Sequence, residues 1–374
     1  MPKFINGPYN YIQLSGNINN IDKNITIFMD IHQDINNQTR CDSFDSFDSL
    51  DISHYLYQLI KKTTTPLDFF LEIRNEQIQE PITDKKDVFI AEVIEMFKTE
   101  FIKRKDKVTH SKSNPNVRLH YLDIRDHLQF SYVKQILNKQ IIPKLTSLKN
   151  DILKDSDKNI KLEEIKKCIN DIKQYTMDIF EKNIDIYHDK STIYDKKSKE
   201  FYLNKIIHKY KHNTLKTNIN NFFNTFFMNY NGDFNKIIFE INTHIIFFKN
   251  DINNPLHLTK IFLLCNKLNK IIYALYALIT DVYFLRRFLD KDYIQNVITY
   301  CGRNHALNYI YFLVKHCDFT IIKIYNSNGL SLDNFINKIK KTDDLNKVHN
   351  LFLIEGEKPK QCVVILRDNI LLGW

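Results

Sequence analysis

Short apolar runs alternate with amphipathic segments in the first third of the chain. The runs 25–29, 67–73 and 117–124 are rich in β-branched and aromatic residues and are bounded by polar or proline-containing segments, which predicts buried strands. Between them, residues 51–61 and 87–104 repeat apolar positions every three or four residues, which predicts two helices. This alternation of strands and helices is typical of a mostly parallel sheet.

The same alternation returns near the C-terminus. Residues 296–301, 319–325 and 362–366 have the composition of strands, and 306–316 and 331–341 have the spacing of helices. Asp51 and Ser331 precede two of the predicted helices, so we expect them to be helix N-caps.

The middle of the chain has a different character. Residues 144–254 contain no proline and one glycine, and their apolar positions recur at helical spacing. The sequence therefore predicts an α/β fold with a mostly parallel central sheet flanked by helices and a large all-helical insertion. We expect residues 1–130 and 256–374 to form the α/β core, and residues 131–255 to form the helical insertion.

The composition is that of a globular chain. Hydrophobic residues make up 43% and charged residues 26% of the sequence, which excludes extended disorder. The most apolar stretch, residues 271–289, is interrupted by Asp281, Arg286 and Arg287, so we expect a buried helix and no membrane span.

The net charge bears on nucleic-acid binding, and the cysteine content bears on the redox environment of the protein. The net charge is +9, but the basic residues are dispersed and the strongest cluster, residues 103–107, is short, so the sequence carries no strong nucleic-acid signal. The six cysteines form no Cys-x-x-Cys motif, and we expect no disulfide framework. With no apolar leader at residues 1–8, this predicts an intracellular protein, placed in the host cytoplasm or the virion if the protein is viral. Neither a substrate nor an oligomeric state is indicated.

Three residues with chemistry-bearing side chains follow predicted strands. His32 follows the strand 25–29, Glu72 lies near the end of 67–73, and His305 follows 296–301. Functional sites in parallel α/β sheets gather at the carboxyl ends of the strands. Two histidines and a glutamate can hold a divalent metal and leave a position open for water. We therefore expect His32, Glu72 and His305 to be metal ligands, with Glu72 also a catalytic candidate.

Other residues near the predicted strand ends have two interpretations. Arg125 closes the third predicted strand and is a catalytic candidate, because an arginine can orient a carboxylate or stabilise an oxyanion. Further candidates are Asp30, Asp123, Gly302 and Asp281. The alternative for all of these residues is structural, as turn, cap or salt-bridge residues.

One motif resembles a known superfamily. Gly302-Arg303-Asn304-His305 after an apolar strand is similar to the terminal Gly-x-x-His motif of the superfamily that contains the TraB/GumN, TIKI, erythromycin esterase and ChaN-like proteins. Its first Gly-x-x-His motif corresponds to residues 29–32, where Met29 stands in place of glycine. The resemblance also implies a catalytic arginine, for which Arg125 is one candidate and Arg286 or Arg287 is another. Residues 20–130 and 260–330 carry the resemblance.

The resemblance implies a metal-dependent or His/Glu-based hydrolase that acts on a peptide or ester bond. The composition is similar to that of proteins of large DNA viruses of protists. Met29 and the helical middle favour an alternative, a non-catalytic viral structural or host-interaction protein that uses the same fold as a scaffold.

Overall fold

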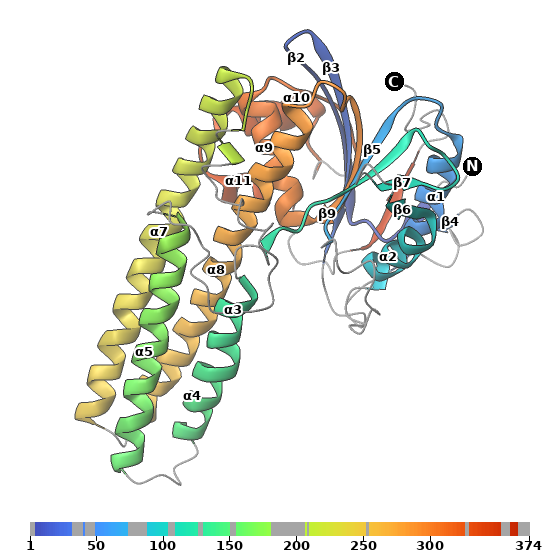
Figure 1. Cartoon of the computed structure of the whole chain (residues 1–374). Helices are drawn as coiled ribbons and strands as arrows, with labels where there is room; N and C mark the ends of the chain where they lie inside the picture. The colour runs from blue at the N-terminus through green and yellow to red at the C-terminus, as the bar shows by residue number, and fades with distance from the viewer. Residues whose placement is uncertain are drawn as a thin grey trace. The chain divides into compact units, whose positions relative to one another are not determined.

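The computed structural model divides the chain into two compact units (Figure 1). Unit 1 comprises Met1–Asp123 and Phe284–Trp374, and unit 2 comprises Ile124–Tyr283. The structure describes residues 4–31, 40–41, 49–73, 88–103, 109–125, 130–149, 155–180, 206–207, 209–251, 254–325, 329–352 and 360–365. Unit 2 ends later than the expected boundary at residue 255.

The main sheet of unit 1 has the strand order β10-β2-β3-β9-β5-β8-β7-β6. The strands are β2 (Asn10–Ile18), β3 (Ile21–Asp30), β5 (Leu67–Leu71), β6 (Phe101–Lys103), β7 (Thr109–Ser111), β8 (Val117–Tyr121), β9 (Asn296–Gly302) and β10 (Thr320–Ile324). Strands β3, β9, β5 and β8 are mutually parallel, and antiparallel pairs flank them on both sides.

The expectation of a mostly parallel sheet is therefore wrong, although the broader α/β class is confirmed. The cause lies partly in strand β2, which forms an antiparallel hairpin with β3. The hairpin turn consists of Asn19 and Asn20, both with positive φ (51° and 66°). Asparagine tolerates this conformation, and a two-residue turn of this kind matches the twist of paired strands.

A second, smaller sheet has the order β11-β1-β4, formed by β11 (Cys362–Val364), β1 (Phe4–Asn6) and β4 (Ser49–Asp51). The predicted C-terminal strand thus pairs with the N-terminal strand and not with the main sheet. A disulfide joins Cys41 to Cys362 beside this sheet. The dispersed cysteines gave no sign of this pairing in the sequence.

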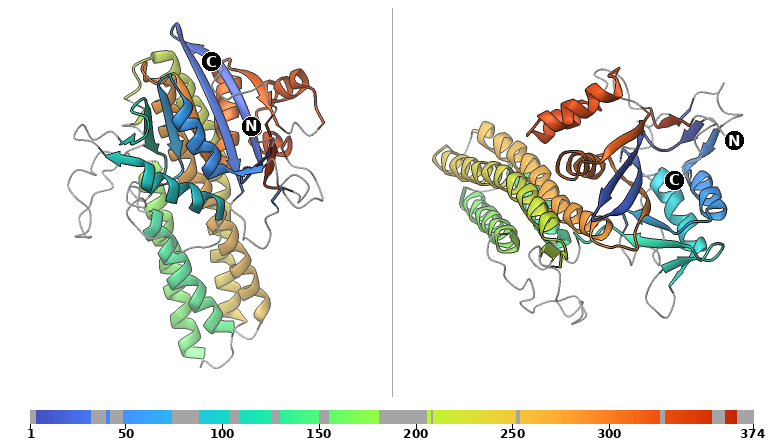
Figure 2. Two further views of the ribbon diagram at one scale, coloured as in Figure 1. Left: turned by 90° about the vertical axis from the view of Figure 1, so that its right-hand side faces the viewer. Right: turned by 90° about the horizontal axis from the view of Figure 1, so that it is seen from above.

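Helices cover both faces of the main sheet (Figure 2). The core on one face includes side chains of α1 (Ile52–Lys62) and α2 (Val88–Glu100). On the other face, Phe70 packs against Phe284 near the end of α8 (Pro255–Leu289), and Phe284 packs against Tyr309 of α9 (Arg303–His316). Unit 1 also contains α10 (Leu332–Lys341) and α11 (Leu345–Asn350).

The two predicted caps differ. Ser331 caps α10, because its side chain accepts a hydrogen bond from the backbone N–H of Asn334. Asp51 occupies the N-cap position of α1, but its side chain makes no capping bond.

The described elements of unit 2 are all helical. They are α3 (Phe130–Gln135), a π-helical segment (Ile136–Ile141), α4 (Ile142–Lys149), α5 (Asp155–Phe180), α7 (Asn213–Asn250) and α8 (Pro255–Leu289), whose last residues from Phe284 belong to unit 1. Helices α5 and α7 run side by side (Figures 1 and 2).

Among the described helices, only α8 is long and apolar enough to cross a membrane by length and composition. A buried core helix passes the same test, and 44% of the most apolar window of α8 is buried.

Candidate functional site

The carboxyl ends of three neighbouring parallel strands bring several predicted residues to one edge of the main sheet. Asp30 at the end of β3 lies opposite Gly302 at the end of β9. On the other side of β9, the backbone N–H of Glu72, just after β5, donates to the carbonyl of Tyr300. We call Asp30, Glu72, Gly302 and His305 the strand-end site.

Glu72 joins the end of β9 to the start of α9. Its Oε2 accepts a hydrogen bond of 2.6 Å from the backbone N–H of Gly302, the residue before α9. Its Oε1 lies 3.2 Å from Nε2 of His305, in the first turn of α9, and both side chains are 6% exposed. A carboxylate is favoured here because the N-terminus of a helix carries a partial positive charge. Glu72 and His305, two of the three residues expected to bind a metal, thus lie in contact with each other.

Asp30 is held on the other side of Gly302. It is 2% exposed, and its Oδ1 accepts a 2.6 Å hydrogen bond from the side-chain amide of Gln361. Burial raises the pKa of Tyr300 well above its ordinary value, and the charge of Asp30 adds to this shift. The sequence gave no sign of Gln361, because it lies more than 300 residues from Asp30 along the chain.

The backbone conformation at position 302 does not require a glycine. Its φ is −58°, which any residue adopts. The glycine of the second motif is therefore not required by a left-handed turn.

The other predicted residues have different positions. His32 lies outside the described residues. Asp123 follows β8, and its backbone N–H donates to the carbonyl of Ile73. Arg125 and Asp281 belong to unit 2, where the guanidinium of Arg125 lies 5.6 Å from the ring centroid of Phe130.

Asp281 is fully buried in α8. Burial, followed by the charge of Asp281, raises the pKa of Tyr230 in the same unit.

Arg286 is in the last turn of α8, and the carbonyl of Phe288 in that turn accepts a hydrogen bond from Nζ of Lys23, near the start of β3. The next residue, Arg287, contacts His120, which lies opposite Phe70 on β5. The last turn of α8 thus packs along the main sheet, and a catalytic role of Arg286 stays a prediction.

The sequence pattern gives no indication of Lys23, a single basic residue near the start of β3. It is fully buried, and its Nζ also donates to the carbonyls of Lys291 and Ile294, so it binds the chain where α8 leads into β9. Burial lowers the pKa of Lys23 to about 8, and nearby aspartates oppose the shift.

A metal centre is not formed by the described residues alone. Among them, no group of three His, Cys, Asp or Glu side chains is arranged to hold a metal ion. The third expected ligand, His32, lies outside this part of the chain. The donors present, a carboxylate and an imidazole, are of the types that divalent transition metals accept.

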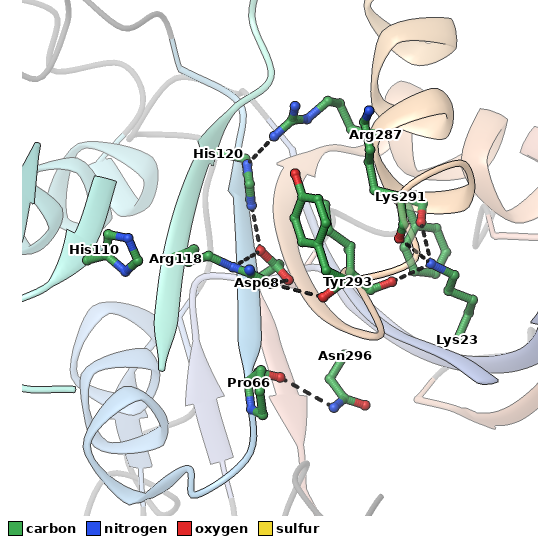
Figure 3. Close-up of polar contacts among 12 residues, drawn as sticks. Lys23, Pro66, Asp68, His110, Arg118, His120, Arg287, Lys291, Tyr293 and Asn296 are labelled. Carbon is green, nitrogen blue, oxygen red and sulfur yellow. Dashed lines mark hydrogen bonds and ion pairs between the residues drawn. The ribbon is translucent and has the colours of Figure 1, made fainter. Parts of the chain in front are cut away.

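A second buried polar cluster lies on the face of the main sheet next to α8 (Figure 3). Asp68 on β5 is 1% exposed. Its Oδ1 lies 2.8 Å from Nε of Arg118 and 2.6 Å from Nε2 of His120, and its Oδ2 lies 2.5 Å from a terminal nitrogen of Arg118. Nδ1 of His120 contacts Arg287 at 3.1 Å. We call these four residues the Asp68 cluster.

The contacts determine the protonation state of the His120 imidazole. Arginine can only donate, so Nδ1 of His120 accepts from Arg287 and Nε2 carries the proton that is donated to Asp68. The imidazole is therefore neutral. Burial lowers the pKa of His120, and the charges of Arg287 and Arg118 add to this shift while Asp68 opposes it.

The lowered pKa of His120 predicts a loss of stability in acid. As the pH falls through about 6.5, the unfolded chain takes up a proton at this position that the folded chain does not bind. The free energy of unfolding should therefore decrease, by at most about 1.4 kcal/mol per pH unit from this group. We expect His120→Gln, whose amide can still donate to Asp68, to lose less stability than the wild type between pH 7 and 5 in urea titrations. Parallel pH profiles of the two proteins would contradict the assignment.

Comparison with known proteins places the chain in a family. The model of a family of unknown function, DUF5847, matches residues 3–257 and 251–366. The chain belongs to this family. No solved structure matches it.

Relatives of this DUF5847 chain occur in a giant virus. One uncharacterised protein of Acanthamoeba polyphaga mimivirus is 30% identical over 405 residues, which cover 92% of this chain and 93% of the relative. Two others are 28% identical, one covering 91% of this chain and 90% of its own length, the other 99% and 98%. The similarity in composition to large DNA virus proteins therefore agrees with where these relatives are found.

Proposed function

We propose that this DUF5847 protein is a diverged hydrolase of the TraB, TIKI and erythromycin-esterase-like class, which cleaves a peptide or ester bond at the strand-end site. One observation carries the proposal: Glu72 and His305 come from different elements and meet at the carboxyl ends of neighbouring parallel strands, with 3.2 Å between Oε1 and Nε2. Sites of α/β proteins gather at this edge.

The proposed mechanism uses Glu72 and His305 as a pair. Glu72 orients the imidazole of His305, and the backbone N–H of Gly302 fixes the carboxylate in turn. His305 accepts a proton from a water molecule as the water oxygen attacks the carbonyl carbon of the substrate, and it then gives the proton to the leaving group. This mechanism assigns no step to Arg286 or Arg125.

A divalent metal bound through His32 is the alternative to this mechanism, because a nitrogen of His305 that binds a metal cannot also accept a proton. Bound by His32, Glu72 and His305, such an ion would supply Lewis acidity at the site. Elemental mass spectrometry of protein purified without chelator tests this. We expect about one equivalent of metal in the wild type, lost in both His32→Ala and His305→Ala. Retention of metal in either variant would remove that histidine from the ligand set.

Hydrolysis by matched variants tests the function. We expect wild-type protein to cleave members of a panel of nitrophenyl esters and fluorogenic peptides, and Glu72→Gln and His305→Ala to lose at least about 100-fold in kcat/KM. His316→Ala, a second histidine of α9 outside the site, is the control and should retain the wild-type rate. Circular dichroism confirms that each variant is folded. Unchanged hydrolysis in Glu72→Gln and His305→Ala would overturn the proposal.

The burial of the pair favours a second candidate, a non-catalytic viral structural or host-interaction protein. Glu72 and His305 are each only 6% exposed, and Glu72 accepts a backbone hydrogen bond at the start of α9. The same contacts would fasten α9 to β5 in a scaffold. This candidate predicts no hydrolysis by the wild type in the substrate panel, with Glu72→Gln and His305→Ala changing only stability.

A further inference from the structure

A disulfide ties together two parts of the chain that are distant in sequence. Cys41 and Cys362 are separated by 321 residues, and their Cα atoms lie 5.0 Å apart, within the usual span of a protein disulfide. Cys362 begins β11, which pairs only with β1 in the described part of the small sheet. Cys362 is 3% exposed, and Cys41 is half-buried.

Asn6 places the two cysteines side by side independently of the disulfide. Asn6 on β1 is the cross-strand partner of Cys362. Its side-chain Oδ1 also accepts a 2.8 Å hydrogen bond from the backbone N–H of Cys41. The neighbouring Arg40 contacts Glu92 at 3.8 Å and lies over the ring of Phe89, which fixes the chain before Cys41 to α2. None of these contacts involves a sulfur atom, so they do not depend on the S–S bond and favour its re-formation after reduction.

The residue before Cys362 connects the disulfide to the strand-end site. The backbone N–H of Gly7 donates to the carbonyl of Gln361, and the side-chain amide of Gln361 donates to the carbonyl of Gly7 and to Asp30. Cys41 has a second connection through the chain, since the segment between Asp30 and Cys41 contains His32. The disulfide is therefore connected to Asp30 through Gln361, the residue next to Cys362.

We propose that Cys41 and Cys362 form a reversible thiol–disulfide switch that fastens β11, and with it Gln361, to β1 beside the strand-end site. On oxidation, the two thiols transfer two electrons and two protons to a disulfide such as oxidised glutathione, which leaves as two thiols. Reduction by two equivalents of reduced glutathione reverses the step. The switch does not rest on the proposed function, because neither the disulfide nor its contacts require hydrolysis.

Differential alkylation tests whether the bond forms reversibly. The full chain is equilibrated with mixtures of reduced and oxidised glutathione, quenched and labelled, and each cysteine is read by mass spectrometry. We expect Cys41 and Cys362 to become protected together as the oxidised fraction rises, and each to stay reactive when the other is changed to serine. Cys317→Ser, which removes one of the free cysteines, is the matched control and should leave this transition unchanged. Independent labelling of Cys41 and Cys362 at every ratio would overturn the proposal.

Hydrogen exchange tests the structural consequence without any need for activity. We expect backbone amides of β1 and β11 to exchange at least about tenfold faster in reduced than in oxidised wild type, with α5 unchanged. Cys41→Ser under oxidising conditions should match the reduced wild type, so the result does not depend on one variant. Equal exchange rates in the two redox states would show that the disulfide does not stabilise β1 and β11, and would overturn the proposal. Because neither readout uses a substrate, a failed hydrolysis screen leaves this test intact.

Discussion

Replacing Asp68 by alanine is expected to lower the free energy of unfolding by about 3–5 kcal/mol. Asp68 is 1% exposed and is the acceptor shared by Arg118 and His120. Its removal leaves an arginine charge and an imidazole N–H without their partner, and the nearby Arg287 adds positive charge. Losing one partner of a buried ion pair costs far more than the pair contributes in net terms, because the remaining group stays desolvated.

Urea denaturation followed by circular dichroism measures this effect. Asp22→Ala is the control, since Asp22 makes an exposed hydrogen bond to Asn17 in the β2–β3 hairpin. We expect the control to change the free energy of unfolding by less than about 0.5 kcal/mol. A loss below about 1 kcal/mol in Asp68→Ala would mean that the Asp68 cluster does not hold β5, β8 and the end of α8 together.

The second large effect is expected at Glu72. Glu72→Ala should reduce the free energy of unfolding by about 2–4 kcal/mol, because it removes the acceptor of the Gly302 N–H and the partner of His305. Glu72→Gln should recover part of this loss, because the amide oxygen can still accept from Gly302. The two variants therefore separate the backbone hydrogen bond from the charge.

An exposed glutamate provides the comparison for Glu72. Glu95 pairs with Lys98 on α2, and its side chain is 58% exposed. Surface pairs of this kind contribute about 0–1 kcal/mol, so Glu95→Ala should have little effect in the same urea titration. Similar losses in Glu72→Ala and Glu95→Ala would contradict the described geometry of Glu72.

Apolar runs were sufficient to predict the central strands. Strands β3, β5, β8 and β9 are buried runs of β-branched and aromatic residues, and such runs are recognisable locally. Because they are parallel, their carboxyl ends share one edge, so Glu72 and His305 could be expected to meet. Strand β2 was missed because Gln13, Ser15 and Gly16 interrupt its apolar pattern.

Local sequence patterns could not predict the contacts between segments that are distant along the chain. The pairing of β1 with β11, and with it Gln361 beside Asp30, depends on how the ends of the chain meet. The Asp68 cluster depends on the register that places Asp68 opposite Arg118. A sequence pattern also cannot show that α8 ends near the start of β3, which the hydrogen bond from Lys23 to the carbonyl of Phe288 establishes.

A double-mutant cycle on Glu72 and His305 tests the central claim most directly, since it needs no substrate. The free energy of unfolding is measured for the wild type, Glu72→Gln, His305→Ala and the double variant. If the two side chains form one buried pair, the effects should be non-additive by at least about 1 kcal/mol. Additive effects, within about 0.3 kcal/mol, would show that Glu72 and His305 do not act together and would contradict the strand-end site.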